Sequence, residues 1–114
     1  MDIEVVQRAK NGDSQALEQI YNDTRPMVYF TALGLVHNED DAEDVVQDTY
    51  VKAFQSLSRL REETAFIGWL KTIVVNIGKN RLKKKKPALF RTDEQESAML
   101  ESIEEVSEDL LPQE

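Results

Sequence analysis

A wide apolar face in the middle of the chain constrains the fold more than any other feature. Small or apolar side chains recur every three or four residues over roughly four turns, which indicates a helix with one side buried. These side chains are Ala42, Val45, Val46, Thr49, Tyr50, Ala53, Phe54 and Leu57. Asn38 can cap this helix, and the carboxylates that follow it suit the positive end of the helix dipole. The pattern therefore predicts a central helix that other helices must cover.

Two helices are expected before the central one. The first is short and ends at Gly12, and Asp13 is placed to cap a second helix that begins at the next residue. Because Pro26 lacks a backbone donor, we expect a kink near Arg25 rather than two separate helices. The apolar stripe of the first helix is Ile3, Val6 and Ala9.

A fourth helix is expected after a loop from Ser58 to Glu63. Thr64 is a reasonable cap for it, and it ends near Pro87. Its aromatic residues fit core positions better than base-stacking positions. The predicted buried side carries Phe66, Trp69, Leu70, Ile73 and Ile77.

The composition favours the same fold class. The 114 residues include only four glycines and three prolines, too few for an all-β chain with frequent tight turns. We expect an all-α fold, a compact bundle of about four helices over residues 1–88, followed by an acidic linker over residues 89–114. The linker can be partly helical, because four of its apolar residues are spaced as in one amphipathic helix. They are Met99, Ile103, Val106 and Leu110.

Several functional classes are excluded or disfavoured. The chain has no cysteine, which excludes disulfides, thiolate zinc sites and a cysteine nucleophile, and His37 is its one histidine. No apolar run approaches the roughly 20 residues of a membrane-spanning helix, so we expect a cytoplasmic protein with no membrane partner. We expect no catalytic residue, cofactor or metal. The acidic run at residues 39–43 does not favour a metal site, because consecutive helical side chains point in different directions.

The net charge of -8 hides three different segments. Residues 1–60 carry 11 acidic and 5 basic side chains, residues 61–91 carry 2 acidic and 9 basic ones, and residues 92–114 carry 9 acidic and none basic. Such asymmetry is typical of a basic strip that meets a polyanion beside acidic surfaces that meet a basic protein. The alternative is that the acidic parts serve solubility alone.

The side of the central helix opposite its apolar face forms an acidic stripe. Neighbouring carboxylates one turn apart repel each other, and this is more easily explained if a basic partner covers them. An ordinary solvated helix face is the alternative. Val51 favours an interface because it is an apolar residue expected on the exposed side. The stripe consists of Asp41, Asp44, Gln47, Asp48, Val51 and Gln55.

The outward side of the fourth helix is expected to form a polar ridge that becomes basic towards its end. Lysines can neutralise phosphates, and Asn and Thr can hydrogen-bond base edges, so this mixture suits nucleic acid better than lysines alone. A frayed, solvated helix end is the alternative for the lysine run. The ridge consists of Thr72, Asn76, Lys79 and Lys83, with Asn80, Arg81 and Lys84 beside them.

Two motifs make the chain resemble a known family. The segment DAEDVVQDTYVKAF at 41–54 and the segment FIGWLKTIVVNIGKNRLKKKK at 66–86 resemble region 2 of bacterial extracytoplasmic-function (ECF) sigma factors. The likeness extends over residues 5–86. The resemblance implies a helical domain that binds the clamp helices of the RNA polymerase β′ subunit. It also implies capture of the single-stranded, non-template -10 element of promoter DNA.

The resemblance also implies roles for residues. Asp41, Asp44, Gln47 and Asp48 match the polymerase-binding motif, to which the exposed Val51 is added. The loop from Leu60 to Thr64, together with Phe66, matches the part that pockets a flipped base, at a cost of a few kcal/mol for flipping. The residues expected to bind DNA are Arg61, Thr64, Phe66, Thr72, Asn76, Lys79, Asn80, Lys83 and Lys84.

The sequence also departs from the family pattern. Leu60 replaces a frequent aromatic residue, Glu62 a frequent glycine and Gly68 a frequent threonine, so the base preference of the loop is not predicted. The family normally has a second, helix-turn-helix domain, of which residues 92–114 resemble only the preceding linker. We expect an N-terminal fragment, with one half of a split sigma factor as the alternative.

The predicted function is a non-enzymatic sigma-factor domain that binds RNA polymerase core and melts the -10 element. It depends on two opposed faces, one acidic and one basic. The alternative is a sigma-like helical adaptor that binds only protein partners, such as an anti-sigma factor.

Overall fold

The computed structural model describes residues 1–86, all of whose regular elements are helical. The helices are α1 (Ile3–Lys10), α2 (Ser14–Val36), α3 (Glu39–Ser56) and α4 (Phe66–Lys85), with short 3-10 turns η1 (Leu57–Arg59) and η2 (Glu63–Ala65) between the last two. The predicted all-α bundle of about four helices is confirmed for this part of the chain. The expected linker and its amphipathic helix lie outside the described residues.

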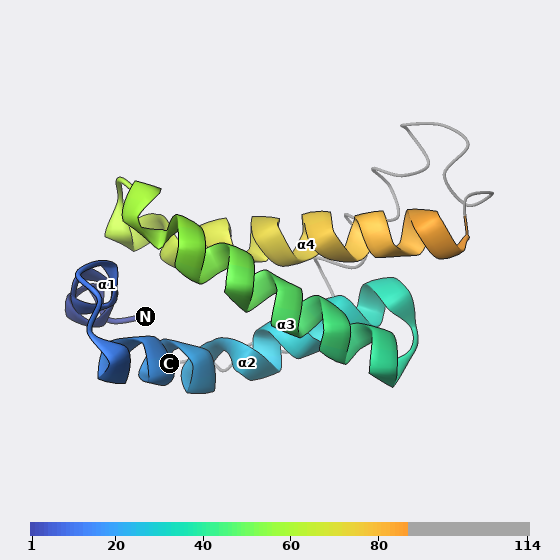
Figure 1. Cartoon of the computed structure of the whole chain (residues 1–114), viewed down its shortest axis with the longest axis horizontal. Helices are drawn as coiled ribbons and strands as arrows, with labels where there is room; N and C mark the ends of the chain where they lie inside the picture. The colour runs from blue at the N-terminus through green and yellow to red at the C-terminus, as the bar shows by residue number, and fades with distance from the viewer. Residues whose placement is uncertain (87–114) are drawn as a thin grey trace.

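Three long helices make up the bundle, and α1 packs at one end. Figure 1 shows α3 crossing diagonally between α2 and α4, so that the start of α3 lies near the end of α4. Each pair among α2, α3 and α4 is in contact, and α1 contacts α2 and both 3-10 turns. The loop after α3 is therefore covered by the first helix of the chain.

Local capping explains where most helices begin. The carboxylate of Asp13 accepts hydrogen bonds from the backbone of Gln15 and Ala16, and the Asn38 side chain accepts one from the backbone N–H of Asp41. Both predicted caps are confirmed, and α2 runs through Pro26 as one helix. The expected kink in α2 stays a prediction.

The prediction that Thr64 caps the fourth helix is wrong. Thr64 lies inside η2, and the residue before α4 is Ala65, whose side chain has no oxygen to accept a hydrogen bond. A 3-10 turn leads directly into α4 instead, and the backbone N–H of Ala65 bonds to the carbonyl of Glu62. The chain thus enters α4 through backbone geometry rather than a side-chain cap.

The buried face of α4 is turned relative to the prediction. Phe66 and Leu70 are buried as expected, but Trp69, Ile73 and Ile77 are only half-buried at the edge of the core. Because α4 packs against both α2 and α3, the face between these two helices is the one that is buried. The buried residues of α4 are Phe66, Leu70, Val74, Val75, Gly78 and Leu82.

Gly78 lies where α4 packs tightly against α2. A Cβ atom at this position would lie 2.6 Å from Cδ1 of Leu35, which is itself fully buried. The missing side chain lets the two helices pack closely.

In α1 the buried residues are Val5, Val6 and Ala9, whereas Ile3, expected in the apolar stripe, is 43% exposed. Within the described range, no helix is long and apolar enough to span a membrane.

Candidate functional site

The outer side of α3 presents a mixed polar and acidic surface. Asp44, Gln47, Asp48 and Gln55 are exposed as predicted, and Val51 is 52% exposed. We call these five residues the α3 face. Their exposure follows from helix geometry, because the opposite side carries the buried residues from Ala42 to Ala53. The α3 face can therefore meet a partner without any change in the core.

Asp41 does not belong to this surface, which corrects the prediction of a solvent-facing stripe that includes it. Its side chain is only 7% exposed, and Nη2 of Arg81 donates a hydrogen bond to its Oδ1 at a distance of 3.0 Å. Lys85 donates to the other carboxylate oxygen. Position 41 lies on the side of α3 that faces the end of α4, so the carboxylate is covered by that helix. The ammonium of Lys85 and then the guanidinium of Arg81 hold the pKa of Asp41 below its usual value.

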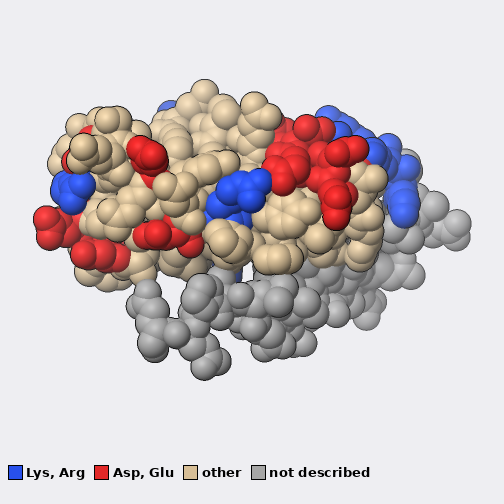
Figure 2. All heavy atoms as spheres, turned by 90° about the horizontal axis from the view of Figure 1, so that it is seen from below, with Lys and Arg blue, Asp and Glu red and all other residues tan. Residues whose placement is uncertain are grey.

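Arg81 also joins the exposed part of α3 to α4. Its Nη2 lies 3.0 Å from Oδ2 of Asp44 as well as 3.0 Å from Asp41. We call Asp41, Asp44, Arg81 and Lys85 the α3–α4 seam. The prediction of two opposed charged faces does not hold at these four residues, because the acidic and basic groups meet there. Figure 2 shows acidic and basic side chains side by side at one end of the molecule.

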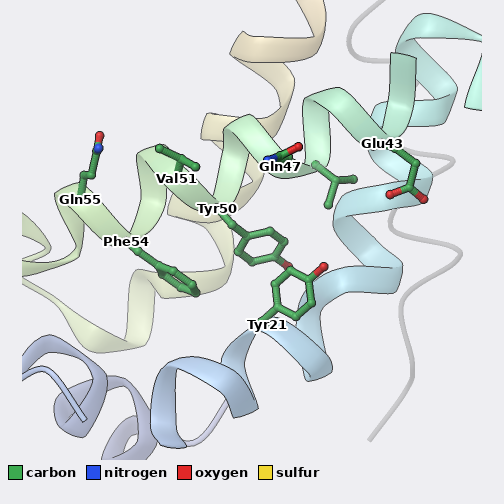
Figure 3. Close-up of a pocket in the computed structure, with 8 residues that line it drawn as sticks. Tyr21, Glu43, Gln47, Tyr50, Val51, Phe54 and Gln55 are labelled. Atoms are coloured by element: carbon green, nitrogen blue, oxygen red, sulfur yellow. The ribbon is translucent and has the colours of Figure 1, made fainter. Parts of the chain in front are cut away.

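A groove runs along the other side of α3, towards α2. It has a volume of about 630 Å³ and is mostly apolar. Figure 3 shows Tyr21 of α2 beside Tyr50 and Phe54 of α3, with Val51 and Gln55 on the adjacent turns. The groove is lined by Tyr21, Glu43, Val46, Gln47, Tyr50, Val51, Phe54 and Gln55. It shares Gln47, Val51 and Gln55 with the α3 face, so the two form one continuous surface.

The floor of the groove is held by aromatic packing. The Tyr21 and Tyr50 rings pack edge to face with centroids 4.7 Å apart, and the Phe54 ring is 5.6 Å from that of Tyr50. The Tyr50 hydroxyl is hydrogen-bonded to that of Thr24 at 2.5 Å. Burial raises the pKa of Tyr50 to about 12, so the phenol stays neutral. The floor is thus an uncharged, preformed surface.

Arg25 holds one end of the groove. Its Nη2 donates to both carboxylate oxygens of Glu43, at 2.8 and 2.7 Å, and its Nε donates to the Tyr21 hydroxyl at 3.2 Å. No motif or spacing in the sequence pointed to Tyr21, Arg25 or Glu43 as site residues. Arg25 and Glu43 lie 18 positions apart on different helices, so no short-range spacing links them.

The outer side of α4 carries the predicted polar ridge. Thr72, Asn76, Asn80 and Lys84 are exposed and follow one another at intervals of four, whereas Lys79 and Lys83 are half-buried. The Thr72 hydroxyl donates to the carbonyl of Gly68 at 3.0 Å, which leaves its oxygen as an acceptor. The exposed row therefore offers a hydroxyl, then two amides and finally a cation.

The loop before α4 is only partly as predicted. Arg61 and Thr64 are exposed, but Phe66 is 1% exposed and packs in the core, with its ring 5.9 Å from that of Trp69. The expected contact of Phe66 with a base is therefore not possible in this structure. Phe66 is the first residue of the buried face of α4, and burying its ring stabilises the fold more than leaving the ring in solvent.

No cluster of three or more possible metal-ligating side chains occurs among residues 1–86.

Comparisons with known proteins agree on one family. The model of the family "Sigma-70 region 2" matches residues 20–87. RNA polymerase sigma-H factor of Pseudomonas aeruginosa is 31% identical over 81 residues, which are 71% of this chain and 42% of that protein. The ECF RNA polymerase sigma-E factor of Haemophilus influenzae is 35% identical over 81 residues, 71% of this chain and 42% of that protein.

A third relative is more distant. The ECF RNA polymerase sigma factor SigW of Bacillus subtilis is 26% identical over 85 residues, which are 75% of this chain and 46% of that protein. The chain thus spans less than half the length of these three curated relatives. No solved structure gives a significant match.

Proposed function

Because the chain belongs to the sigma-70 region 2 family, we propose that it is the part of an ECF sigma factor that acts in transcription initiation. In this proposal it binds RNA polymerase core and holds the opened, non-template strand of the promoter -10 element. Residues 1–88 form the working domain and residues 89–114 a linker. The domain is a binding module without catalytic chemistry that acts where polymerase acts, in the cytoplasm.

The observation that carries this proposal is the division of exposed polar groups between two helices of one body. On α3, Gln47, Asp48 and Val51 stand on a surface continuous with an apolar groove. An apolar groove with a polar rim is suited to a partner helix, and the exposed carboxylate of Asp48 on the adjoining α3 face favours a basic one. We therefore assign the α3 face and the groove to the β′ clamp helices of polymerase.

The α4 row supports the second half of the proposal. Asn76 and Asn80 are exposed hydrogen-bonding side chains, and Lys84 follows on the same side of the helix. Amides can bond base edges that an opened strand presents, and lysine neutralises phosphate. The exposed loop residues Arg61 and Thr64 precede this row and extend the proposed DNA surface.

The charge of the chain supports dependence on polymerase. At a net charge of -8, the isolated protein should bind duplex DNA weakly, because phosphate neutralisation supplies most non-specific affinity. Tight binding of the isolated chain to random duplex DNA at physiological salt would contradict the proposal.

The polymerase assignment is tested with Asp48→Lys, measured as affinity for purified core polymerase. Asp23→Lys on α2 is the matched control, because it makes the same charge change at another exposed helical position. We expect at least about a tenfold loss of affinity for Asp48→Lys, since a repulsive charge replaces an attractive one at the contact. Asp23→Lys should bind normally, and equal binding by both variants would remove the assignment.

The DNA assignment is tested with Asn80→Ala in the complex of the chain with core polymerase. Asn22→Ala removes the same amide from an exposed site on α2 and serves as the control. Capture of single-stranded -10 DNA should weaken by about fivefold or more, because a good contact to a base edge is worth about 1 to 3 kcal/mol. Unchanged capture would exclude Asn80 from the DNA surface.

The groove also favours the alternative of an adaptor that binds only protein, for example an anti-sigma factor. An apolar groove is suited to a helix of any such partner. A competition experiment separates the two: if core polymerase does not bind the chain and an anti-sigma candidate does, the adaptor is the function.

A further inference from the structure

The last residue of α1 holds the loop that precedes α4. The ammonium of Lys10 donates to the backbone carbonyl of Leu60 at 2.6 Å and to Oε1 of Glu63 at 3.2 Å. These contacts join residues 50 and 53 positions apart in the chain. The Lys10 and Glu63 side chains are only 20% and 24% exposed, so the contact is shielded from solvent. No sequence motif pointed to Lys10.

The loop between α3 and α4 is framed by two short 3-10 turns. The two 3-10 turns that frame it are closed by the backbone bonds from Leu60 to Leu57 and from Ala65 to Glu62, and neither turn has a side-chain cap. Leu60 is buried, whereas Arg61, Glu62 and Thr64 are exposed. Lys10 contacts the chain on both sides of the exposed Arg61 and Glu62, and therefore limits the positions that these side chains can take.

The chemistry of the contact favours a lasting anchor. A charged donor makes a stronger hydrogen bond to a carbonyl than a neutral one does. The loop's own backbone and then Lys10 hold the pKa of Glu63 below its usual value, so the carboxylate stays charged opposite the ammonium. α1 contacts both η1 and η2, which keeps the anchor beside the loop.

We propose that Lys10 is a positioning residue that fixes the loop from Leu60 to Thr64 and thereby sets how strongly the protein discriminates among bases of single-stranded DNA. The inference rests on the proposed function, in which the exposed Arg61 and Thr64 of this loop belong to the surface that meets the bases of the opened strand. Lys10 does not touch the base itself. Discrimination needs a fixed arrangement of pocket groups, whereas overall affinity comes largely from phosphate contacts elsewhere.

The test measures base preference rather than affinity alone. Core polymerase carrying the full chain captures single-stranded oligonucleotides with six randomised positions, and the captured pool is sequenced. Lys10→Met removes the ammonium and keeps an apolar stem. Arg8→Met is the matched control, since it breaks the ion pair between Arg8 of the same helix and Asp13, rather than the pair with Glu63.

With Lys10→Met we expect the base preference at one or two adjacent positions of the oligonucleotide to fall by about tenfold. The reason is that a shift of the loop by about 1 Å can cost up to a hundredfold in a preorganised site. Preference at the remaining positions and total capture should change by less than about threefold, since the phosphate contacts stay. Arg8→Met should retain the native preference. Equal losses in both variants, or a native preference in Lys10→Met, would overturn the inference.

A second variant covers the case in which Lys10→Met does not fold. Glu63→Gln weakens one of the two Lys10 contacts and keeps the bond to the Leu60 carbonyl. It should lower the preference at the same positions by about threefold and speed amide hydrogen exchange at residues 57–65. If Glu63→Gln keeps native preference and native exchange, the inference is wrong. Failure of the unmodified chain to capture any oligonucleotide contradicts the proposed function instead.

Discussion

Helix α3 is held by its two long neighbours in different ways. Towards α2, the contact is made by buried and aromatic side chains, with Tyr50 hydrogen-bonded to Thr24 and packed against Tyr21. Towards the end of α4, the contact is the α3–α4 seam, in which a buried carboxylate lies between two partly exposed cations. Apart from the exposed Arg25–Glu43 pair at its edge, the first contact is uncharged, whereas the second depends on charge.

The α2 contact supports the shape of the groove, whereas the α4 contact responds to charge. The contact with α2 forms the floor of the groove and should persist at any moderate pH or salt concentration. The seam uses cations of the helix proposed to bind DNA and carboxylates of the helix proposed to bind polymerase. Mutations of the buried aromatic residues on the α2 side should therefore change stability most, and mutations at the seam should change its dependence on pH and salt. The exposed Arg25–Glu43 pair should add only a small, salt-dependent contribution.

Tyr50→Ala should have the largest effect. Removing a buried aromatic ring leaves a cavity and costs about 3 to 5 kcal/mol of unfolding free energy. Urea unfolding followed by circular dichroism measures the loss. Tyr29→Ala is the control, because Tyr29 is only half-buried on α2, and it should cost clearly less. Equal losses would mean that the aromatic floor is not a special support of α3.

Asp41→Asn should have a smaller effect than Tyr50→Ala, because Arg81 and Lys85 can turn towards solvent. The lowered pKa of Asp41 means that its carboxylate stabilises the fold above the ordinary value of 3.8. This contribution is lost as the pH falls through the still lower folded value. The stability difference between the native chain and Asp41→Asn should therefore be largest near pH 7 and shrink below about pH 4. A difference independent of pH would contradict the role of charge at the seam.

Some parts of the fold could be predicted from sequence because they are local. A cap depends on one side chain and the next three backbone groups, so Asp13 and Asn38 were identified correctly. Which side of α4 is buried does not depend on local sequence alone, since Gly78 is buried against Leu35 of α2. Periodicity alone placed Ile73 and Ile77 inside and missed Val74 and Val75.

The candidate site shows the same division. The exposure of Gln47, Asp48 and Val51 follows from the pattern of their own helix. The burial of Asp41 depends on α4 lying across it, and the anchoring role of Lys10 depends on a loop 50 residues away. Helix periodicity indicates which residues share a side, and tertiary packing decides which of them stay accessible.

Tyr50→Phe sharpens the comparison on the α2 side. It keeps the ring and removes the hydroxyl that is bonded to Thr24. The cost should be about 0.5 to 1.5 kcal/mol, because the Thr24 hydroxyl keeps its bond to the carbonyl of Ile20. The loss should be the same at pH 5 and pH 8, since the phenol is neutral throughout. A pH-dependent loss measured by urea unfolding would show that charge reaches this contact after all.

Arg25→Gln should have the smallest effect on stability. Its pair with Glu43 is exposed, with the two side chains 37% and 52% accessible, and exposed pairs contribute about 0.2 to 1 kcal/mol. Thermal unfolding in low salt should detect the loss, and about 0.5 M NaCl should reduce it because salt screens exposed pairs. Arg25 also orients Tyr21 and Glu43 at the end of the groove, so the same variant should weaken binding of core polymerase more than it weakens folding. Native affinity for the polymerase would place the binding contact further along α3, around Val51 and Gln55.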